Sequence, residues 1–296
     1  MSEPDFDRLR ELRACEPSAI ARAAAARERR PLLRDDGRLM LVAADHPARG
    51  ALGVRDVADA MADRHDLLRR LVITLGRPGV DGVLGTADII EDLLLLGALE
   101  GKVVIGSMNR GGLQGATFEL DDRFTGYDAA TIAAMGFDGG KMLTRIDLAD
   151  AGSVATLESC GRAVGELAAF ELMAMVEPFL AHRVSDRVVN DLSAVGVRKS
   201  VVIAGALGAT SAYTWLKLPV VDDMELVMAA TTLPTLLLGG DPAGHPEETY
   251  AKWERALALP GVRGLVVGRA LLYPPDGDVA SAVDAAVSLV REGAVT

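Results

Sequence analysis

The sequence of 296 residues has no apolar run of the roughly 20 residues that a membrane-spanning helix needs, and its charged N-terminus lacks the apolar centre of a signal peptide. Its two cysteines, Cys15 and Cys160, are far apart and form no CxxC pattern, which is typical of reduced thiols. The net charge of −11 argues against a nucleic acid or an anionic membrane as partner. We therefore expect a cytoplasmic protein that binds neither.

Histidine is also scarce, and its spacing indicates no metal centre. The four histidines, His46, His65, His182 and His245, form no HxH or HExxH motif, whereas a catalytic zinc site usually takes three ligands rich in His or Cys. No GxGxxG follows the first apolar strand, so a dinucleotide site of the doubly wound type is not indicated either. The sequence predicts chemistry without a metal or a cofactor.

Short apolar runs alternate with segments of helical period along most of the chain, which is typical of repeated βα units and a parallel sheet. Because eight such runs occur and no low-complexity linker interrupts them, we predict a (β/α)8 TIM barrel over residues 37–296. The predicted strands are 39–44, 79–84, 102–105, 139–143, 172–176, 214–218, 235–238 and 264–267. The predicted helices are 55–75, 87–99, 153–169, 186–195, 246–259 and 279–291.

Two segments do not fit the repeat. Residues 1–36 are rich in Arg, Ala and Glu, and they predict a helical extension that closes the bottom of the barrel or packs on a second subunit, so a homo-oligomer is expected. A basic nucleic-acid arm is the alternative, although Glu and Asp interrupt its charge. Segment 106–127 is too long for an ordinary connection and predicts a loop over the active site.

Lysine is rare, with five residues among 31 basic ones, and two of the lysines lie in apolar strands. Lys217 lies in AYTWLKLPVV, where desolvation lowers the pKa of an amine and increases the neutral fraction that attacks a carbonyl. A structural lysine at a strand end is the alternative. Lys141, in FDGGKMLTRI, would either lower the pKa of Lys217 and bind a substrate anion, or form a structural ion pair with Asp45 or Glu177.

Carboxylates and glycines complete the predicted site, because barrel enzymes collect function at the carboxyl ends of their strands. Asp45 and Glu177 follow apolar strands directly, as proton-transfer groups or as partners in salt bridges. The turns after the last two strands, LLLGGD and VVGRALL, are predicted to hold a phosphate, although a Gly-Gly pair alone is also typical of a tight turn. The residues of this predicted phosphate site are Gly239, Gly240, Gly268 and Arg269.

From about residue 38 to 273, this pattern resembles the class I aldolases of the tagatose-bisphosphate and archaeal-type fructose-bisphosphate group, including related barrel proteins of actinobacterial inositol catabolism. The resemblance implies that Lys217 forms a Schiff base, that Glu177 transfers protons and that Lys141 supports both. It also matches Asp45 to the acid at the end of the first strand. Which of the two carboxylates is the principal proton carrier stays open.

The sequence departs from that pattern at His46 and Pro47, and in the long loop that contains Asn109, Arg110 and Gln114. We interpret these departures as polar contacts to a substrate group that common sugar bisphosphates lack, and we include His46 and Asn109 in the predicted site. The resemblance favours a phosphorylated sugar as substrate, and specifically 2-deoxy-5-keto-gluconate 6-phosphate, cleaved to dihydroxyacetone phosphate and malonate semialdehyde. The alternatives are an aldolase for a sugar bisphosphate or sulfonated ketose phosphate, a phosphosugar isomerase, and a catalytically silent phosphate-binding barrel.

Overall fold

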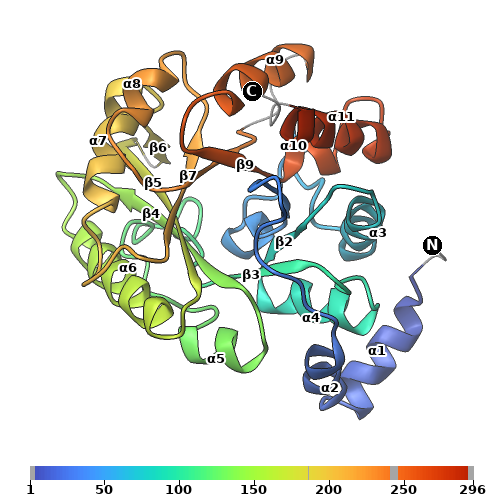
Figure 1. Cartoon of the computed structure of the whole chain (residues 1–296). Coiled ribbons are helices and arrows are strands. Elements are labelled where there is room, and N and C mark those ends of the chain that lie inside the picture. Colours follow the sequence, from blue (N-terminus) through green and yellow to red (C-terminus); the bar gives the residue numbers. More distant parts are fainter. Residues whose placement is uncertain (1–3, 186, 241–245, 293–296) are drawn as a thin grey trace.

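A closed ring of eight parallel strands forms the centre of the protein, and helices surround it (Figure 1). The structure is a computed structural model and describes residues 4–185, 187–240 and 246–292. Strands pair in the order β1, β2, β3, β4, β5, β7, β8 and β9, and β9 pairs back with β1. The predicted TIM barrel is therefore confirmed. Its strands are β1 (Leu39–Ala43), β2 (Gly82–Gly85), β3 (Val103–Ser107), β4 (Gly139–Ile146), β5 (Met173–Val184), β7 (Thr214–Pro219), β8 (Thr235–Leu238) and β9 (Val262–Val267).

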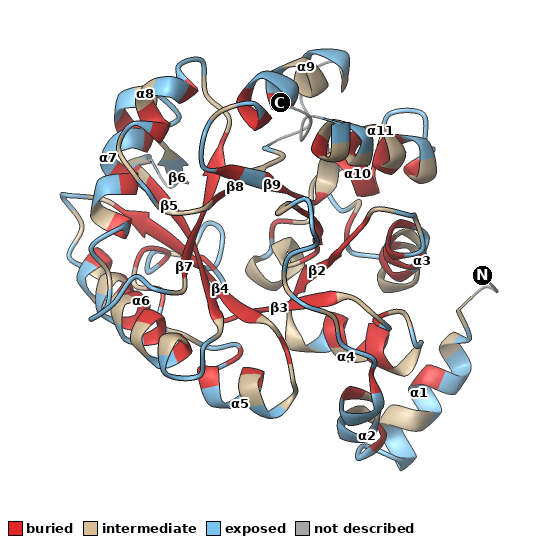
Figure 2. Ribbon diagram, viewed as in Figure 1, coloured by how far each residue is buried: buried red, intermediate tan, exposed pale blue. Residues whose placement is uncertain are grey.

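The outer helices turn one buried face toward the strands and one exposed face outward (Figure 2). None of the helices in the described part of the chain combines the length and apolarity that crossing a membrane takes. A short 3-10 helix, η1 (His46–Arg49), follows β1 directly. The helices around the barrel are α3 (Arg64–Leu75), α4 (Ala87–Leu95), α5 (Ala129–Ala134), α6 (Gly152–Ala169), α7 (Ala194–Ala204), α8 (Met224–Met228), α9 (Pro246–Leu257), α10 (Arg269–Leu272) and α11 (Val279–Glu292).

Side chains of each strand alternate between the interior of the barrel and the layer beneath the helices. On β1, Leu39, Leu41 and Ala43 belong to the apolar cluster inside the barrel. Met40 and Val42, in the positions between them, belong to the larger cluster shared with the helices. This period of two is the ordinary geometry of a strand, so the sequence position alone decides which residues face the barrel interior.

The N-terminal extension consists of α1 (Phe6–Cys15) and α2 (Ala19–Ala26), which lie beside α3 and α4 on the outside of the barrel (Figure 1). The Phe6 ring stacks on His65, with 4.0 Å between ring centroids, and Arg13 Nε donates to Asp92 Oδ1 at 2.7 Å. The helices themselves do not close the barrel. The non-helical residues that follow α2 do, because Leu32 packs against the interior cluster from below.

At the bottom of the barrel, the fully buried Asp81 forms ion pairs with arginines from both ends of the chain. Arg30 Nη1 lies 2.5 Å and Arg34 Nε 2.6 Å from Asp81 Oδ1, and Arg291 of α11 also pairs with this carboxylate. The backbone N–H of Met40 donates to Asp81 Oδ2 at 2.7 Å. We call Asp81, Arg30, Arg34 and Arg291 the bottom cluster; it ties the extension and the last helix to the start of β2.

One predicted helix, 186–195, is wrong. Instead β5 extends past the barrel to Val184 and pairs in antiparallel register with β6 (Arg187–Asn190), while the next helix starts only at Ala194. Exposed and half-buried residues alternate along β6, which is the period of a strand. Asp186 lies outside the described residues.

Other boundaries moved by a few residues. The helix predicted from residue 55 begins at Arg64, because the side chain of Asp63 accepts hydrogen bonds from the backbone N–H groups of His65 and Asp66 and so caps the first turn. β2 begins at Gly82 and β9 at Val262, and the short helices α5 and α8 were not predicted. The long connection after β3 is confirmed, since residues 108–128 form no helix or strand.

Candidate active site

Four charged side chains occupy interior-facing positions near the carboxyl ends of the strands. Asp45 lies two residues beyond Ala43, so it continues the inward set of β1. By the same alternation Glu177 follows Met175 on β5, and Lys217 follows Trp215 on β7. Lys141 of β4 is paired with Met175 in the sheet register and completes the group. We call these four residues the mouth cluster.

The mouth cluster is a continuous chain of ion pairs. Lys141 Nζ lies 2.7 Å from Asp45 Oδ2 and 2.7 Å from Glu177 Oε2. Lys217 Nζ lies 3.1 Å from that same oxygen of Glu177. The side chains of both lysines are 4% exposed and those of both carboxylates 10%, so water screens these pairs poorly. Glu177 is the link between the two amines.

The pKa values of the two lysines are shifted in opposite directions, although both lysines pair with Glu177. Burial lowers the pKa of Lys217, and the charge of Lys141 lowers it further against the pull of Glu177. Burial acts in the same sense on Lys141, but Asp45 and Glu177 outweigh it and raise the pKa of that amine. Lys217 is therefore the amine that more readily becomes neutral, and Lys141 is the one that keeps its proton.

Both carboxylates are held ionised by their neighbours. Burial alone would raise the pKa of Glu177, but Lys141 and Lys217 lower it to about 2. The same two lysines outweigh the effect of burial on Asp45 and hold its pKa well below the ordinary range. Loss of the proton from Lys217 removes one of the two positive charges that lower the pKa of Glu177, so the basicity of Glu177 is coupled to the state of that amine.

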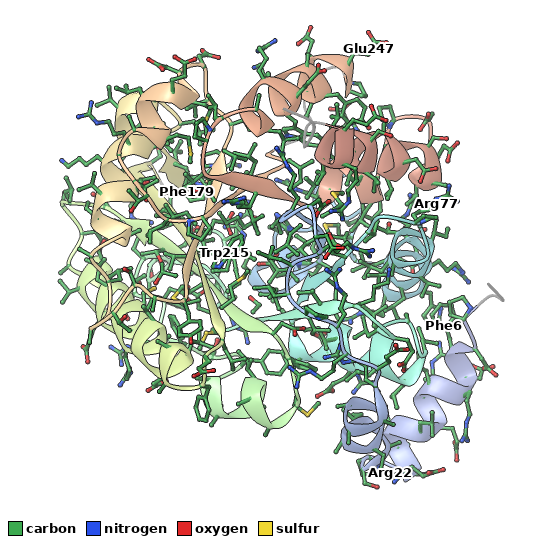
Figure 3. The ribbon with its side chains drawn as sticks, in the orientation of Figure 1. Phe6, Arg22, Arg77, Phe179, Trp215 and Glu247 are labelled. Carbon is green, nitrogen blue, oxygen red and sulfur yellow. The ribbon has the colours of Figure 1, made fainter. Side chains whose placement is uncertain are left out.

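The mouth cluster forms the floor of a cavity that opens to solvent, with about 950 Å³ of empty space. Phe179 of β5 lines its wall, whereas Trp215, labelled near the centre of Figure 3, lies deeper in the barrel, two residues before Lys217. In the described part of the chain, no group of three or more His, Cys, Asp or Glu side chains is placed to hold a metal ion.

The residues predicted to hold a phosphate also line this cavity: Gly239, Gly240, Gly268 and Arg269. Gly240 has a φ of 68°, a left-handed conformation that favours glycine. A Cβ on Gly268 would lie 2.6 Å from the carbonyl oxygen of Ala43, so only glycine lets the end of β9 approach β1 this closely. In both turns the observed backbone geometry therefore favours glycine.

His46 and Asn109, the two further predicted contacts, have different surroundings. His46 lines the cavity, and burial lowers its pKa to about 3, so the imidazole is neutral near pH 7. The side-chain amide of Asn109 instead bonds both backbone polar groups of Leu143, donating to its oxygen at 2.8 Å and accepting from its N–H at 2.9 Å. Asn109 is not among the residues that line the cavity and holds the start of the long loop against β4.

Arg110 of the long loop, which the sequence analysis named among the departures from the family pattern, lines the cavity, whereas two other polar lining residues, Arg49 and Asn190, were not predicted. Asn190 ends β6, in the segment that the sequence predicts as a helix, and its Oδ1 is buried without a hydrogen-bond partner among the described residues. Arg49 closes η1, three residues after His46, and only the turn of that short helix brings it to the cavity. Neither carries a sequence motif that would have revealed it.

The sequence profile of the Cgl0159-like family matches residues 37–287. The chain belongs to the Cgl0159-like family. It is 58% identical to Cgl0159 from Corynebacterium glutamicum (Brevibacterium flavum). The match to the crystal structure of that protein covers 97% of each chain, with a TM-score of 0.95. No curated protein matches the sequence.

More distant structures share the fold of this Cgl0159-like protein. An archaeal fructose-1,6-bisphosphate aldolase, whose catalytic Lys is covalently bound to the carbinolamine intermediate of its substrate, is 18% identical over 92% of this chain and 99% of its own, with a TM-score of 0.64. A fructose-bisphosphate aldolase from Slackia heliotrinireducens is 14% identical over 99% and 94%, with a TM-score of 0.58. At such low identity these likenesses show a common barrel.

Proposed function

We propose that this protein is a class I aldolase that cleaves a phosphorylated ketose through a Schiff base on Lys217. The observation that carries the proposal is the contrast between the two buried lysines, which touch the same oxygen of Glu177 while only Lys217 has a lowered pKa. A neutral amine beside a fixed cation is what attack on a ketone requires. The shared barrel of the Schiff-base aldolases agrees with this chemistry.

The reaction begins when the neutral amine of Lys217 adds to the ketone carbon. The carbinolamine takes up a proton on its hydroxyl and loses water, which leaves a protonated imine. A base then removes the proton of the hydroxyl group on the second carbon from the imine carbon. The bond between that carbon and the carbon next to the imine breaks, and its electron pair forms an enamine. The aldehyde leaves, the enamine carbon is protonated, and water releases a triose phosphate and regenerates the amine.

Glu177 is our choice for the group that carries these protons. Its Oε2 lies 3.1 Å from Lys217 Nζ, so it is next to the atom on which the imine forms. Asp45 pairs with Lys141 and not with Lys217, with 2.7 Å between Oδ2 and Nζ. This supports a role for Asp45 in holding the Lys141 ammonium group in place. Lys141 then stabilises the ionised form of Glu177 between proton transfers.

The phosphate of the substrate is assigned to the glycine turns and Arg269, where backbone N–H groups and a guanidinium can share its charge. We propose 2-deoxy-5-keto-gluconate 6-phosphate as the substrate, giving dihydroxyacetone phosphate and malonate semialdehyde. An aldolase acting on a sugar bisphosphate or a sulfonated ketose phosphate is the second candidate, because the same cluster and the same turns would serve it.

Reduction with borohydride tests the proposed mechanism. Incubation with dihydroxyacetone phosphate and borohydride should attach one reduced triose phosphate to the protein, and peptide mass spectrometry should place it on Lys217. An isomerase or a silent phosphate-binding barrel forms no imine and would stay unlabelled. Absence of any adduct, with triose phosphate still released from a ketose phosphate, would refute the Schiff-base mechanism.

A further inference from the structure

The short strand β6 continues the wall of the barrel above the end of β7. One edge of β5 is paired with β4 as far as Leu180. β6 must therefore use the other edge, where the N–H of Asp191 donates to the carbonyl oxygen of Leu180 at 2.8 Å. Lower down, through residues 174–176, that other edge pairs with β7, and through residues 181–184 it pairs with β6. β6 thus stands over β7, the strand that carries Lys217.

The side chain of Asn190, the last residue of β6, faces the interior of the mouth. Glu177 and Phe179 of β5 both line the cavity, and Ala181 is the next residue in that alternating set. Asn190 lies directly opposite Ala181 in the antiparallel register. Directly opposite residues of paired strands point to the same face of the sheet. Asn190 accordingly lines the same cavity.

The amide oxygen of Asn190 is buried and has no hydrogen-bond partner among the described residues. Most buried polar atoms in folded proteins have a partner, because an unpaired one has lost its bonds to water without replacement. A ligand in the cavity can supply this partner. It must be a donor, since a carboxamide oxygen only accepts. Ionised phosphate and carboxylate groups have no proton to donate, so a hydroxyl group is the donor that a phosphorylated ketose offers.

The position of Asn190 in the ring of strands selects one hydroxyl group. Under the proposed function the phosphate lies at the turns after β8 and β9, and the imine forms on Lys217 of β7. The next carbon of the substrate then lies at the following position of the ring, where β6 stands beside β5. That carbon carries the free hydroxyl group of the triose phosphate half. The hydroxyl group one carbon further on is the one whose proton Glu177 is proposed to take.

We infer that Asn190 Oδ1 accepts a hydrogen bond from the free hydroxyl group of the triose phosphate half. The inference rests on the proposed aldolase function and narrows the ketone that the site takes to hydroxyketone phosphates. The hydrogen bond fixes the rotation about the bond that joins the imine carbon to the hydroxyl-bearing carbon, and so holds the bond that breaks in one orientation. Asn190 is thus a specificity-determining residue.

The test compares two ligands that differ by this hydroxyl group alone, dihydroxyacetone phosphate and 2-oxopropyl phosphate. Both carry the ketone and the phosphate, so borohydride should trap both on Lys217 after equilibration. The quantity measured is the half-saturating concentration of 2-oxopropyl phosphate divided by that of dihydroxyacetone phosphate. This ratio should fall by about tenfold from the wild-type protein to Asn190→Leu and to Asn190→Ala, because only asparagine accepts from the hydroxyl group. Intrinsic differences between the two ketones cancel in this comparison.

Two further variants sharpen the test. Asn190→Asp keeps an acceptor oxygen, so it should retain most of the preference for dihydroxyacetone phosphate, while its negative charge weakens the binding of both phosphates. Val189→Ala is the matched control, since Val189 is the preceding residue of β6, belongs to the opposite face of the hairpin and is 42% exposed. It should bind both ligands as the wild-type protein does.

An unchanged ratio in Asn190→Leu and Asn190→Ala would overturn the inference. If the affinity for both ligands is also unchanged, the hydroxyl group is bound elsewhere and solvent satisfies the amide oxygen. If both ligands lose affinity equally, Asn190 only supports the structure of the hairpin.

Failure of the proposed function gives a different result. In that case neither ligand forms an adduct on Lys217 of the wild-type protein, and the inference fails together with the aldolase proposal. An adduct on Lys217 combined with an unchanged ratio shows that only the inference about Asn190 is wrong.

Discussion

The barrel has a buried ionic cluster at each end, and the two are built from different cations. The bottom cluster pairs one fully buried carboxylate with three arginines, whereas the mouth cluster pairs two carboxylates with two lysines. A guanidinium stays charged at every pH a protein meets, but a buried amine can lose its proton. The bottom cluster is therefore suited to permanent structure, and the mouth cluster to chemistry that needs a neutral nucleophile.

The strongest test of this contrast removes the nucleophile. Lys217→Ala should lower turnover by at least about 10⁴-fold, the order seen when covalent nucleophiles are removed from other enzymes, and should abolish borohydride labelling. Lys199→Ala, on the exposed side of α7, is the control and should behave as wild type. Steady-state kinetics and mass spectrometry measure both effects. A Lys217→Ala protein that is still labelled would move the nucleophile to another amine.

The second test separates the two lysines of the mouth cluster. Lys141→Met should keep a labelled protein that turns over about a hundredfold more slowly, because a charge that supports proton transfer is lost while the nucleophile remains. The pKa of Lys217 should rise, since a cation that lowers it is gone and the two carboxylates lose their partner. The rate of labelling against pH reports this shift. An adduct found on Lys141 in the wild-type protein would reverse the two roles.

The third test breaks the bottom cluster. Asp81→Asn should lower the free energy of unfolding by about 3 kcal/mol, because three arginines lose their buried partner, and should leave kcat unchanged at low temperature. Urea titration and steady-state kinetics measure the two quantities. A large loss of kcat in a folded variant would show that the two ends of the barrel are coupled.

The stabilisation that Asp81 provides depends on pH, and the direction of this dependence follows from the pKa of its carboxyl group. Burial alone would raise the pKa of Asp81, but hydrogen bonds from Arg34, from the N–H of Met40 and from Arg30 bring it below the ordinary value. The stabilisation is therefore fully present above the unfolded pKa of about 3.9 and is lost as the pH falls through the lower folded pKa. The gap between wild type and Asp81→Asn should close in that acidic range.

The smallest expected effect concerns the phosphate side of the mouth. Arg269→Gln should raise KM for a ketose phosphate by about tenfold and change kcat by no more than about twofold, because the phosphate is remote from the bond that breaks. Arg263→Gln, on the exposed position of β9, is the control. An unchanged KM would remove Arg269 from the phosphate site.

Local pattern was sufficient for the barrel and for the mouth cluster. Eight apolar runs with helical segments between them have few other ways to bury their faces. Lys141 and Lys217 were predicted because lysine is rare in this chain and these two lie in apolar strands, and Asp45 and Glu177 because they directly follow apolar strands. The hairpin of β5 and β6 was not, because its exposed alternation lies outside the repeating unit.

The sequence by itself determined the fold and the choice of the four charged residues of the mouth, since both follow from local patterns: apolar runs between helical segments, and charged residues within or directly after those runs. Only the tertiary structure shows that Glu177 joins the two lysines, that the side chain of Asn109 bonds the backbone of Leu143, and that Arg110 donates to the carbonyl oxygen of Ala48 in η1. Each of these depends on distances between segments remote in sequence. So do the opposite pKa shifts of Lys141 and Lys217, because burial and neighbouring charge act through space and no strand pattern encodes them.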